Sequence, residues 1–95
     1  MPLDSFIADI FHLSHYYYMD DIDDREYLKL FGKRIKTLRK THNLSQTDLA
    51  GKANLEKTAI QRIERGYNST LRTLRKLANA FDMNLAELFD FSKDD

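Results

Sequence analysis

Several hydrogen-bonding side chains are spaced along residues 57–65 so that a helix would place them on one face. These side chains are Lys57, Thr58, Gln61, Arg62 and Arg65. At about 100° per residue they span about 140° of the helix circumference, and Ile60 and Ile63 fall outside that arc. Cations, an amide and a hydroxyl without a carboxylate among them suit phosphate oxygens and the acceptor edges of bases in a major groove. Many solvated helices have a similar polar face, so the neighbouring residues must decide between the two interpretations.

Residues 46–66 contain two short helical patterns that meet at a tight break. Apolar residues recur at helical spacing in each pattern, namely Leu49, Ala50 and Ala53 in the first and Leu55, Ile60 and Ile63 in the second. Ala50 is small, as a close approach of two steeply crossing helices requires. Asn54 stands at the turn, where we expect a left-handed backbone that Asn tolerates better than most residues. The segment therefore has the layout of a helix-turn-helix.

With this layout the sequence resembles the phage repressor and Cro-type helix-turn-helix family, also called the XRE family of bacterial transcriptional regulators. The resemblance covers residues 27–90 and includes the segments IKTLRKTHNLSQTDLAGKANLEKTAIQRIERG and LRTLRKLANAFDMNLAELF. The residues that match the family pattern are Gln46, Leu49, Ala50, Leu55, Ile60, Ile63, Glu64 and Gly66. The resemblance implies an all-α fold, a compact five-helix repressor-like DNA-binding domain. It also implies a sequence-specific transcriptional regulator, most simply a repressor, that needs no cofactor.

The resemblance further assigns roles to individual side chains. Lys57, Thr58, Gln61 and Arg62 would read bases of double-stranded DNA, and Arg65 shares their polar face. Gln46 would contact a phosphate or a neighbouring side chain, and Lys40 and Ser45 would contact the DNA backbone. Arg39 and Glu64 correspond to a pair that forms a partly buried salt bridge in this family. The family usually binds as a symmetric dimer, so we expect a homodimer on two half-sites about one helical turn apart.

Three departures from the family pattern stand near the expected DNA surface. Asn54 replaces the usual Gly, and Glu56 replaces a Ser or Thr whose hydroxyl caps the recognition helix. A carboxylate at position 56 is mildly repulsive toward a DNA backbone. The loop YNSTL after Gly66 is about one residue shorter than in common members of the family and lacks their proline.

The net charge of zero conceals a strong division along the chain. Residues 1–26 carry a net charge of −6, residues 27–89 carry +8 and residues 90–95 carry −2. A basic domain flanked by acidic segments is typical of proteins with a nucleic-acid surface. The acidic run from Asp20 to Asp24 also fits a simple solvated linker.

The spacing of apolar residues predicts the elements that hold the motif. A long helix is expected from Asp24 to Thr41, with Tyr27, Phe31, Ile35 and Leu38 on its buried stripe. Ser45 with Asp48 predicts a capping box before the next helix, and Gly66 a left-handed end to the one after it. A fourth helix is expected over residues 70–81 through Leu71, Leu74, Leu77, Ala78 and Phe81. A second capping box, Asn84 with Glu87, predicts a short fifth helix over residues 85–91.

The domain division predicted from these patterns is an N-terminal extension with an acidic linker at 1–23, the DNA-binding domain at 24–91 and an acidic tail at 92–95. The extension contains an apolar stripe, Phe6, Ile7, Ile10 and Phe11, which predicts one extra helix. This helix would dock on the domain, pair with another subunit, or await a protein partner. The last option gives the alternative function, an antitoxin-like or adaptor module that binds a protein partner through residues 1–23. The pair His12 and His15 with Asp9 is too sparse for a metal site.

The sequence lacks the residues that other classes of function would require. The chain has no cysteine, which suits a reducing cytoplasm, and no Gly-rich phosphate loop or nucleophile with a matching base, so we expect no enzyme activity. The apolar residues near the N-terminus are too few for a signal peptide or a membrane span. The candidates for the dimer contact are Leu85, Leu88, Phe89 and Phe91, and a place in the core is the alternative for each of them.

Overall fold

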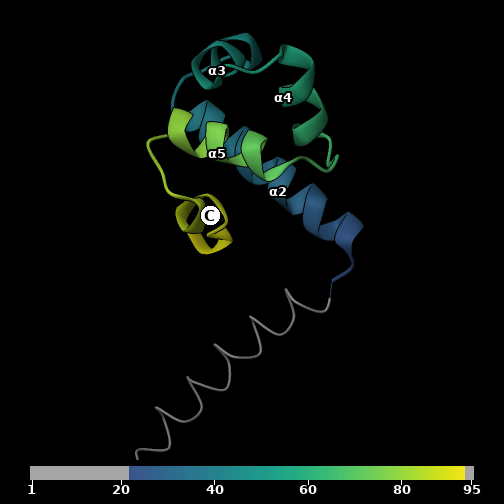
Figure 1. Cartoon of the computed structure of the whole chain (residues 1–95). Helices are drawn as coiled ribbons and strands as arrows, with labels where there is room; N and C mark the ends of the chain where they lie inside the picture. Colours follow the sequence, from purple (N-terminus) through teal and green to yellow (C-terminus); the bar gives the residue numbers. More distant parts are fainter. Residues whose placement is uncertain (1–21, 94–95) are drawn as a thin grey trace, which may run out of the picture.

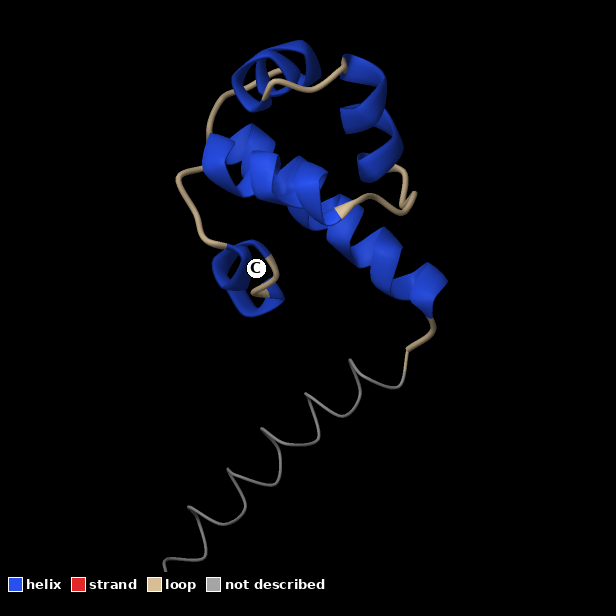
Figure 2. Cartoon of the chain, viewed as in Figure 1, coloured by secondary structure: helices blue, strands red, loops and turns tan. Residues whose placement is uncertain are grey.

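The computed structural model describes residues 22–93. In this range the chain forms α-helices and one 3-10 turn, without a strand (Figures 1 and 2). The elements are α2 (Asp24–Thr41), α3 (Gln46–Ala53), α4 (Lys57–Glu64), α5 (Leu71–Ala80), α6 (Leu85–Leu88) and the 3-10 turn η1 (Phe91–Lys93). The all-α class with five helices is therefore confirmed. The expected N-terminal helix and the His12 and His15 pair lie outside the described residues.

Helix α2 has the predicted boundaries because both of its ends are specified locally. The Asp23 carboxylate accepts a hydrogen bond from the Glu26 amide at 2.8 Å and caps the N-terminus. Acidic side chains occupy the first turn and basic ones the last, as the helix dipole favours. The helix packs against α4 and passes below the motif and behind α5 in the view of Figure 1.

The turn between α3 and α4 has the expected left-handed residue. Asn54 adopts φ 55° and ψ 50°, and the Leu55 amide donates to the Ala50 carbonyl at 2.8 Å. The capping box of Ser45 and Asp48 opens α3 with hydrogen bonds of 2.9 and 3.0 Å. Gly66 follows α4 with φ 97°, as predicted. These local signals fix how the two motif helices leave the turn.

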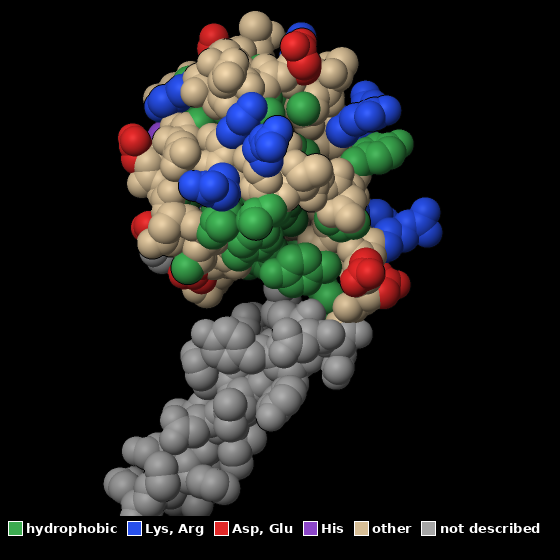
Figure 3. Space-filling view, viewed as in Figure 1, with side chains coloured by type: hydrophobic (Ala, Val, Ile, Leu, Met, Phe, Trp, Pro, Cys, Tyr) green, Lys and Arg blue, Asp and Glu red, His purple; other side chains and the backbone are tan. Residues whose placement is uncertain are grey.

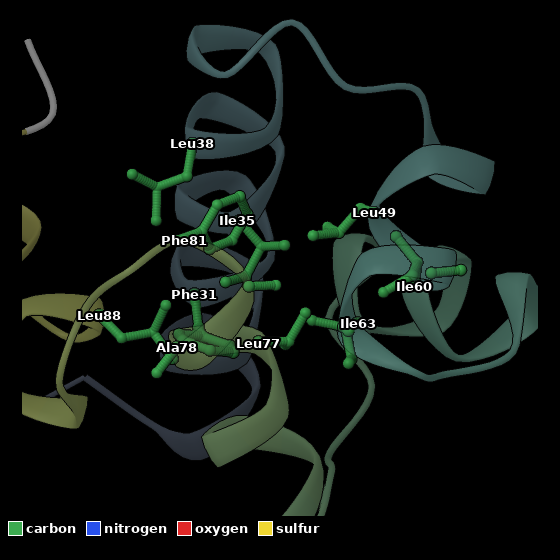
Figure 4. Packing of buried hydrophobic residues seen from close by; sticks show 13 residues of the cluster. Phe31, Ile35, Leu38, Leu49, Ile60, Ile63, Leu77, Ala78, Phe81 and Leu88 are labelled. Atoms are coloured by element: carbon green, nitrogen blue, oxygen red, sulfur yellow. The ribbon is translucent and has the colours of Figure 1, made fainter.

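The core lies where α2, α3, α4 and α5 meet. Its buried hydrophobic members are Phe31, Ile35, Leu38, Leu49, Ala50, Ala53, Ile60, Ile63, Leu77, Ala78, Ala80, Phe81 and Leu88. Figure 4 shows Leu49, Ile60 and Ile63 pointing from the motif toward the side chains of α2 and α5. Because these three side chains are almost fully buried, the motif helices cannot rotate without opening the core.

Two residues of α2 have a role in packing that their types did not predict. A Cβ atom on Gly32 would lie 2.5 Å from the Ile63 carbonyl oxygen, so only glycine permits this approach of α2 to α4. Arg34 is 3% exposed and donates to the carbonyls of Glu87 and Leu88 at 2.9 and 3.3 Å. A buried cation on α2 therefore holds the end of α6.

The last two helices differ from the predicted ones in detail. Leu71 is 63% exposed, so its place on the core stripe of the fourth helix was wrong. It is the first residue of α5, whereas the buried residues Leu77, Ala78 and Ala80 lie in the second half of the helix. The fifth helix was expected to continue to residue 91 but ends at Leu88, and a separate 3-10 turn follows. This break lets Phe89 stack on Phe31, with ring centroids 4.8 Å apart.

The four residues proposed for a dimer contact differ in their burial. Leu88 is fully buried and belongs to the core of one chain. Leu85, Phe89 and Phe91 are half-buried and pack against the same core. The Phe91 ring also lies 5.3 Å from that of Tyr27 at the start of α2. Only the outer surfaces of these three side chains remain for another subunit.

Candidate nucleic-acid interface

The outward face of α4 presents most of the predicted base-reading side chains to solvent. Lys57, Thr58 and Arg62 are exposed, and Gln61 is half-buried. Arg65, the C-cap of the helix, is also exposed. The opposite face is anchored by the buried Ile60 and Ile63. The separation of polar and apolar faces expected from the sequence is thus present in the fold.

The first turn of α4 lacks the side-chain cap that is usual at such a helix start. Glu56 is the N-cap residue with an extended backbone, φ −74° and ψ 147°, but its carboxylate makes no capping hydrogen bond. Its negative charge still lies at the positive end of the helix dipole, where it is favourable. The N-terminal end of α4 therefore combines a favourable dipole for phosphate with one exposed carboxylate that repels it.

A hydrogen-bonded network fixes the end of α4 against α2 and α3. The Glu64 carboxylate accepts from Arg39 Nε at 2.7 Å and from Arg39 Nη2 at 3.0 Å. Glu64 Oε1 also lies 3.3 Å from Gln46 Nε2, and Arg39 Nη1 donates to the Leu44 carbonyl at 3.0 Å. The hydrogen bond with Glu64 raises the pKa of Arg39 above its ordinary value, so the guanidinium stays charged.

The three residues predicted to contact the DNA backbone belong to this network or directly adjoin its members in the sequence. Gln46 begins α3 and is held by Glu64, so its expected contact with an adjacent side chain is present. Ser45 is exposed, and its hydroxyl accepts a hydrogen bond from the Asp48 amide. Lys40 is exposed in the last turn of α2, next to Arg39. The chain thus brings these residues to the same end of the motif.

Tyr67 is a residue of this region that the sequence did not single out. Its ring centroid lies 5.8 Å from the guanidinium carbon of Arg62, and its side chain is 58% exposed. Asn68 and Ser69 follow it and line a surface groove together with Thr58 and Arg62. The sequence signal for this contact was an aromatic residue placed directly after the helix-ending Gly66 and five residues after Arg62.

Basic side chains continue from the motif onto α5. Arg72, Arg75 and Lys76 line one side of that helix, and the Lys76 ammonium donates to the Asn54 carbonyl at 3.3 Å. Figure 3 shows Lys and Arg side chains gathered on this face above a hydrophobic area. The positive charge read from residues 27–89 is therefore spread over several elements.

Comparison with known proteins places this arrangement in a family. The family HTH_3, described as helix-turn-helix, matches residues 35–88, which include α3, its turn and α4. The chain belongs to the HTH_3 family of XRE and Cro-like regulators. It is a helix-turn-helix DNA-binding transcriptional regulator, from a family that is not enzymatic.

The similar proteins include a phage repressor and a control protein. This HTH_3 regulator is 41% identical over 58 residues to the immunity repressor protein of Bacillus phage phi105, a match that covers 60% of this chain and 40% of the repressor. The chain thus spans less than half of that repressor's length. It is 35% identical over 65 residues to control protein C.BamHI of Bacillus amyloliquefaciens, which covers 66% of this chain and 80% of that protein.

A solved structure resembles both the sequence and the fold of the regulator. The restriction-modification controller protein C.AhdI from Aeromonas hydrophila is 39% identical, with a TM-score of 0.62. The likeness covers 64% of this chain and 94% of the controller protein.

Residues 22–93 contain neither a candidate membrane span nor a candidate metal site. No helix in this range is long and apolar enough to cross a membrane. No cluster of His, Cys, Asp or Glu in the described part of the chain is arranged to hold a metal ion.

Proposed function

We propose that this regulator binds a specific DNA sequence through the outward face of α4 and represses transcription by covering a promoter. The observation that carries the proposal is the pairing of an exposed polar face, Lys57, Thr58 and Arg62, with a fully packed opposite face on one helix. Such a helix enters a major groove as a rigid element. The match to a phage immunity repressor supports repression over activation.

The proposed contacts fall into two classes. Lys57, Thr58, Gln61 and Arg62 read base edges, since amide and guanidinium groups pair with the adenine and guanine edges of the major groove. Lys40, Ser45, Gln46 and Arg65 bind phosphate oxygens and set the register of the helix on the duplex. The domain that performs this task comprises residues 24–91, with residues 1–23 as an extension and residues 92–95 as a tail.

A homodimer is the proposed binding form. Two copies place two α4 helices in successive major grooves when their half-sites are about 34 Å apart. The outer surfaces of the half-buried Leu85, Phe89 and Phe91 are the proposed contact. Sedimentation on operator DNA tests this form, and a monomer on a palindromic site would contradict it.

Control of restriction-modification genes is a second candidate for the biological role. It is favoured by how much of each relative is matched, since the likeness covers 94% of C.AhdI and 80% of C.BamHI but 40% of the phage repressor. A restriction enzyme gene beside this one would support control, whereas a toxin gene would support the antitoxin-like role, in which residues 1–23 bind a protein partner.

Selection from random duplex DNA tests the proposed function. The selected site is then titrated against a scrambled site by fluorescence anisotropy across a salt series. We expect a palindromic site bound roughly a thousandfold more tightly than scrambled DNA. Equal and weak binding to both duplexes, lost at physiological salt, would reject sequence-specific recognition and favour a protein partner.

A further inference from the structure

Arg62 and Tyr67 are joined by two separate contacts. The Arg62 guanidinium lies over the Tyr67 ring, with 5.8 Å from its carbon to the ring centroid. The Tyr67 amide also donates a hydrogen bond to the Arg62 carbonyl at 3.0 Å. This backbone hydrogen bond closes the turn at the end of α4, across the left-handed Gly66, and so fixes the position of the Tyr67 backbone.

Tyr67 also borders a groove that is lined by residues of α2 and α5. Tyr67, Tyr27, Leu28 and Leu74 line one groove, whereas Arg62 lines the neighbouring groove with Thr58. Tyr67 therefore lies between this groove and the expected DNA surface. Tyr67 is 58% exposed at this place, so its ring is accessible from solvent.

A cation over an aromatic face keeps its hydrogen-bonding edge free. The ring attracts the guanidinium through its π face, while the N–H groups point outward in the plane of the cation. Bidentate recognition of guanine uses those in-plane N–H groups and demands a fixed orientation. A side chain already restrained in the free protein loses less rotamer freedom on binding.

We propose that Tyr67 is a positioning residue that orients Arg62 and sharpens the choice of base at the position Arg62 reads. The inference rests on the proposed function, since it requires Arg62 to contact a base. Tyr67 acts through the arginine, so its loss affects one base pair rather than the whole site. Tyr67→Phe retains the ring and its attraction for the cation, and is the matched conservative variant.

The test measures discrimination at every base pair of the selected site for Arg62→Ala, Tyr67→Ala, Tyr67→Phe and the double alanine variant. Arg62→Ala lowers the ratio of affinities at one base pair, by about 5- to 150-fold for a lost bidentate contact. Tyr67→Ala lowers the ratio at the same base pair by about two- to fivefold, the size of an exposed cation–π contact. Tyr67→Phe retains the ratio, and the double variant equals Arg62→Ala alone.

Different outcomes separate this inference from the proposed function. If Arg62→Ala changes no base preference, the base-reading role of Arg62 is wrong. If it does but Tyr67→Ala weakens all sequences equally, or the two losses add in the double variant, Tyr67 does not position the arginine. Glu56 lines the same groove as Arg62, so Glu56→Gln is measured in parallel. Loss of the same ratio in that variant but not in Tyr67→Ala would assign the positioning to the carboxylate instead.

Discussion

Arg39 and Glu64 form a bidentate ion pair that joins the last turn of α2 to the end of α4, the proposed recognition helix. The Nε and Nη2 groups donate to the two carboxylate oxygens at 2.7 and 3.0 Å, and the side chains are only 11% and 5% exposed. Because Gln46 donates to the same carboxylate, one buried charge organises three helices. Glu64 thus connects the packing of the fold to the orientation of the DNA-facing residues.

Removing one partner of this pair should destabilise the protein strongly. We expect Arg39→Met and Glu64→Leu each to lower the free energy of unfolding by about 3–5 kcal/mol, since each leaves a buried charge uncompensated. The double variant should lose much less than the two single losses together. Urea unfolding of the four proteins measures the coupling, and a coupling near zero would reject the buried pair.

Gly32 and Gly51 give a matched pair of helical glycines with opposite predictions. Gly32→Ala pushes a Cβ atom to 2.5 Å from the Ile63 carbonyl oxygen and must move α2 away from α4, so the midpoint of unfolding should fall. Gly51→Ala meets no atom within 4 Å on α3 and should stabilise the protein by about 0.5–1 kcal/mol. Thermal unfolding of both variants measures this, and a stable Gly32→Ala protein would mean that the two helices are not in contact.

Asp48 predicts a dependence of stability on pH. Hydrogen bonds from the Ser45 amide and hydroxyl lower its pKa in the folded state. A lowered folded pKa stabilises the fold above the ordinary value of about 3.9 and loses this contribution as pH falls through the lower value. Asp48→Asn should therefore be less stable than the wild type at pH 7, with a difference that shrinks below about pH 4. Urea titrations at several pH values measure this, and a difference that stays constant to low pH would contradict it.

The uncapped start of α4 offers a stabilising substitution. Glu56 has the extended backbone of an N-cap residue without the hydrogen bond, and Asp has a shorter carboxylate that suits this bond. We expect Glu56→Asp to raise the free energy of unfolding by about 1 kcal/mol while retaining the charge. Glu56→Gln, which neither caps nor carries the charge, is the control. Equal stability of the two variants would show that no cap forms.

Much of the fold was predictable because its signals are local. Asp23, Ser45 and Asn84 cap helices through side chains three residues from their partners, and Asn54 and Gly66 adopt left-handed backbones. Such contacts depend on a few consecutive residues. The Arg39 and Glu64 pair was expected from the family resemblance alone, since 25 residues separate its members.

The remaining features depend on how distant segments meet. Gly32 is required by backbone atoms of residues 63 and 64, and Arg34 by carbonyls more than fifty residues away. No periodicity in α2 indicates either role, since a charged residue at position 34 is expected to face solvent. The early end of α6 has the same origin, because the Phe89 ring packs on Phe31. The contact of Tyr67 with Arg62 likewise depends on the course of the chain after Gly66.

Arg62 and Lys40 should affect DNA binding in different ways. Arg62 stands on the outward face of α4, so Arg62→Ala should alter the preferred base at one position of the site and cost about 1–3 kcal/mol there. Lys40 is exposed at the end of α2, where a cation contacts phosphate without reading sequence. Lys40→Ala should therefore weaken specific and scrambled duplexes alike and reduce the salt slope by about one. Anisotropy titrations on single-base variants of the selected site measure both effects. If the two substitutions weaken every sequence equally, α4 binds DNA only by charge and the division into base and phosphate contacts is wrong.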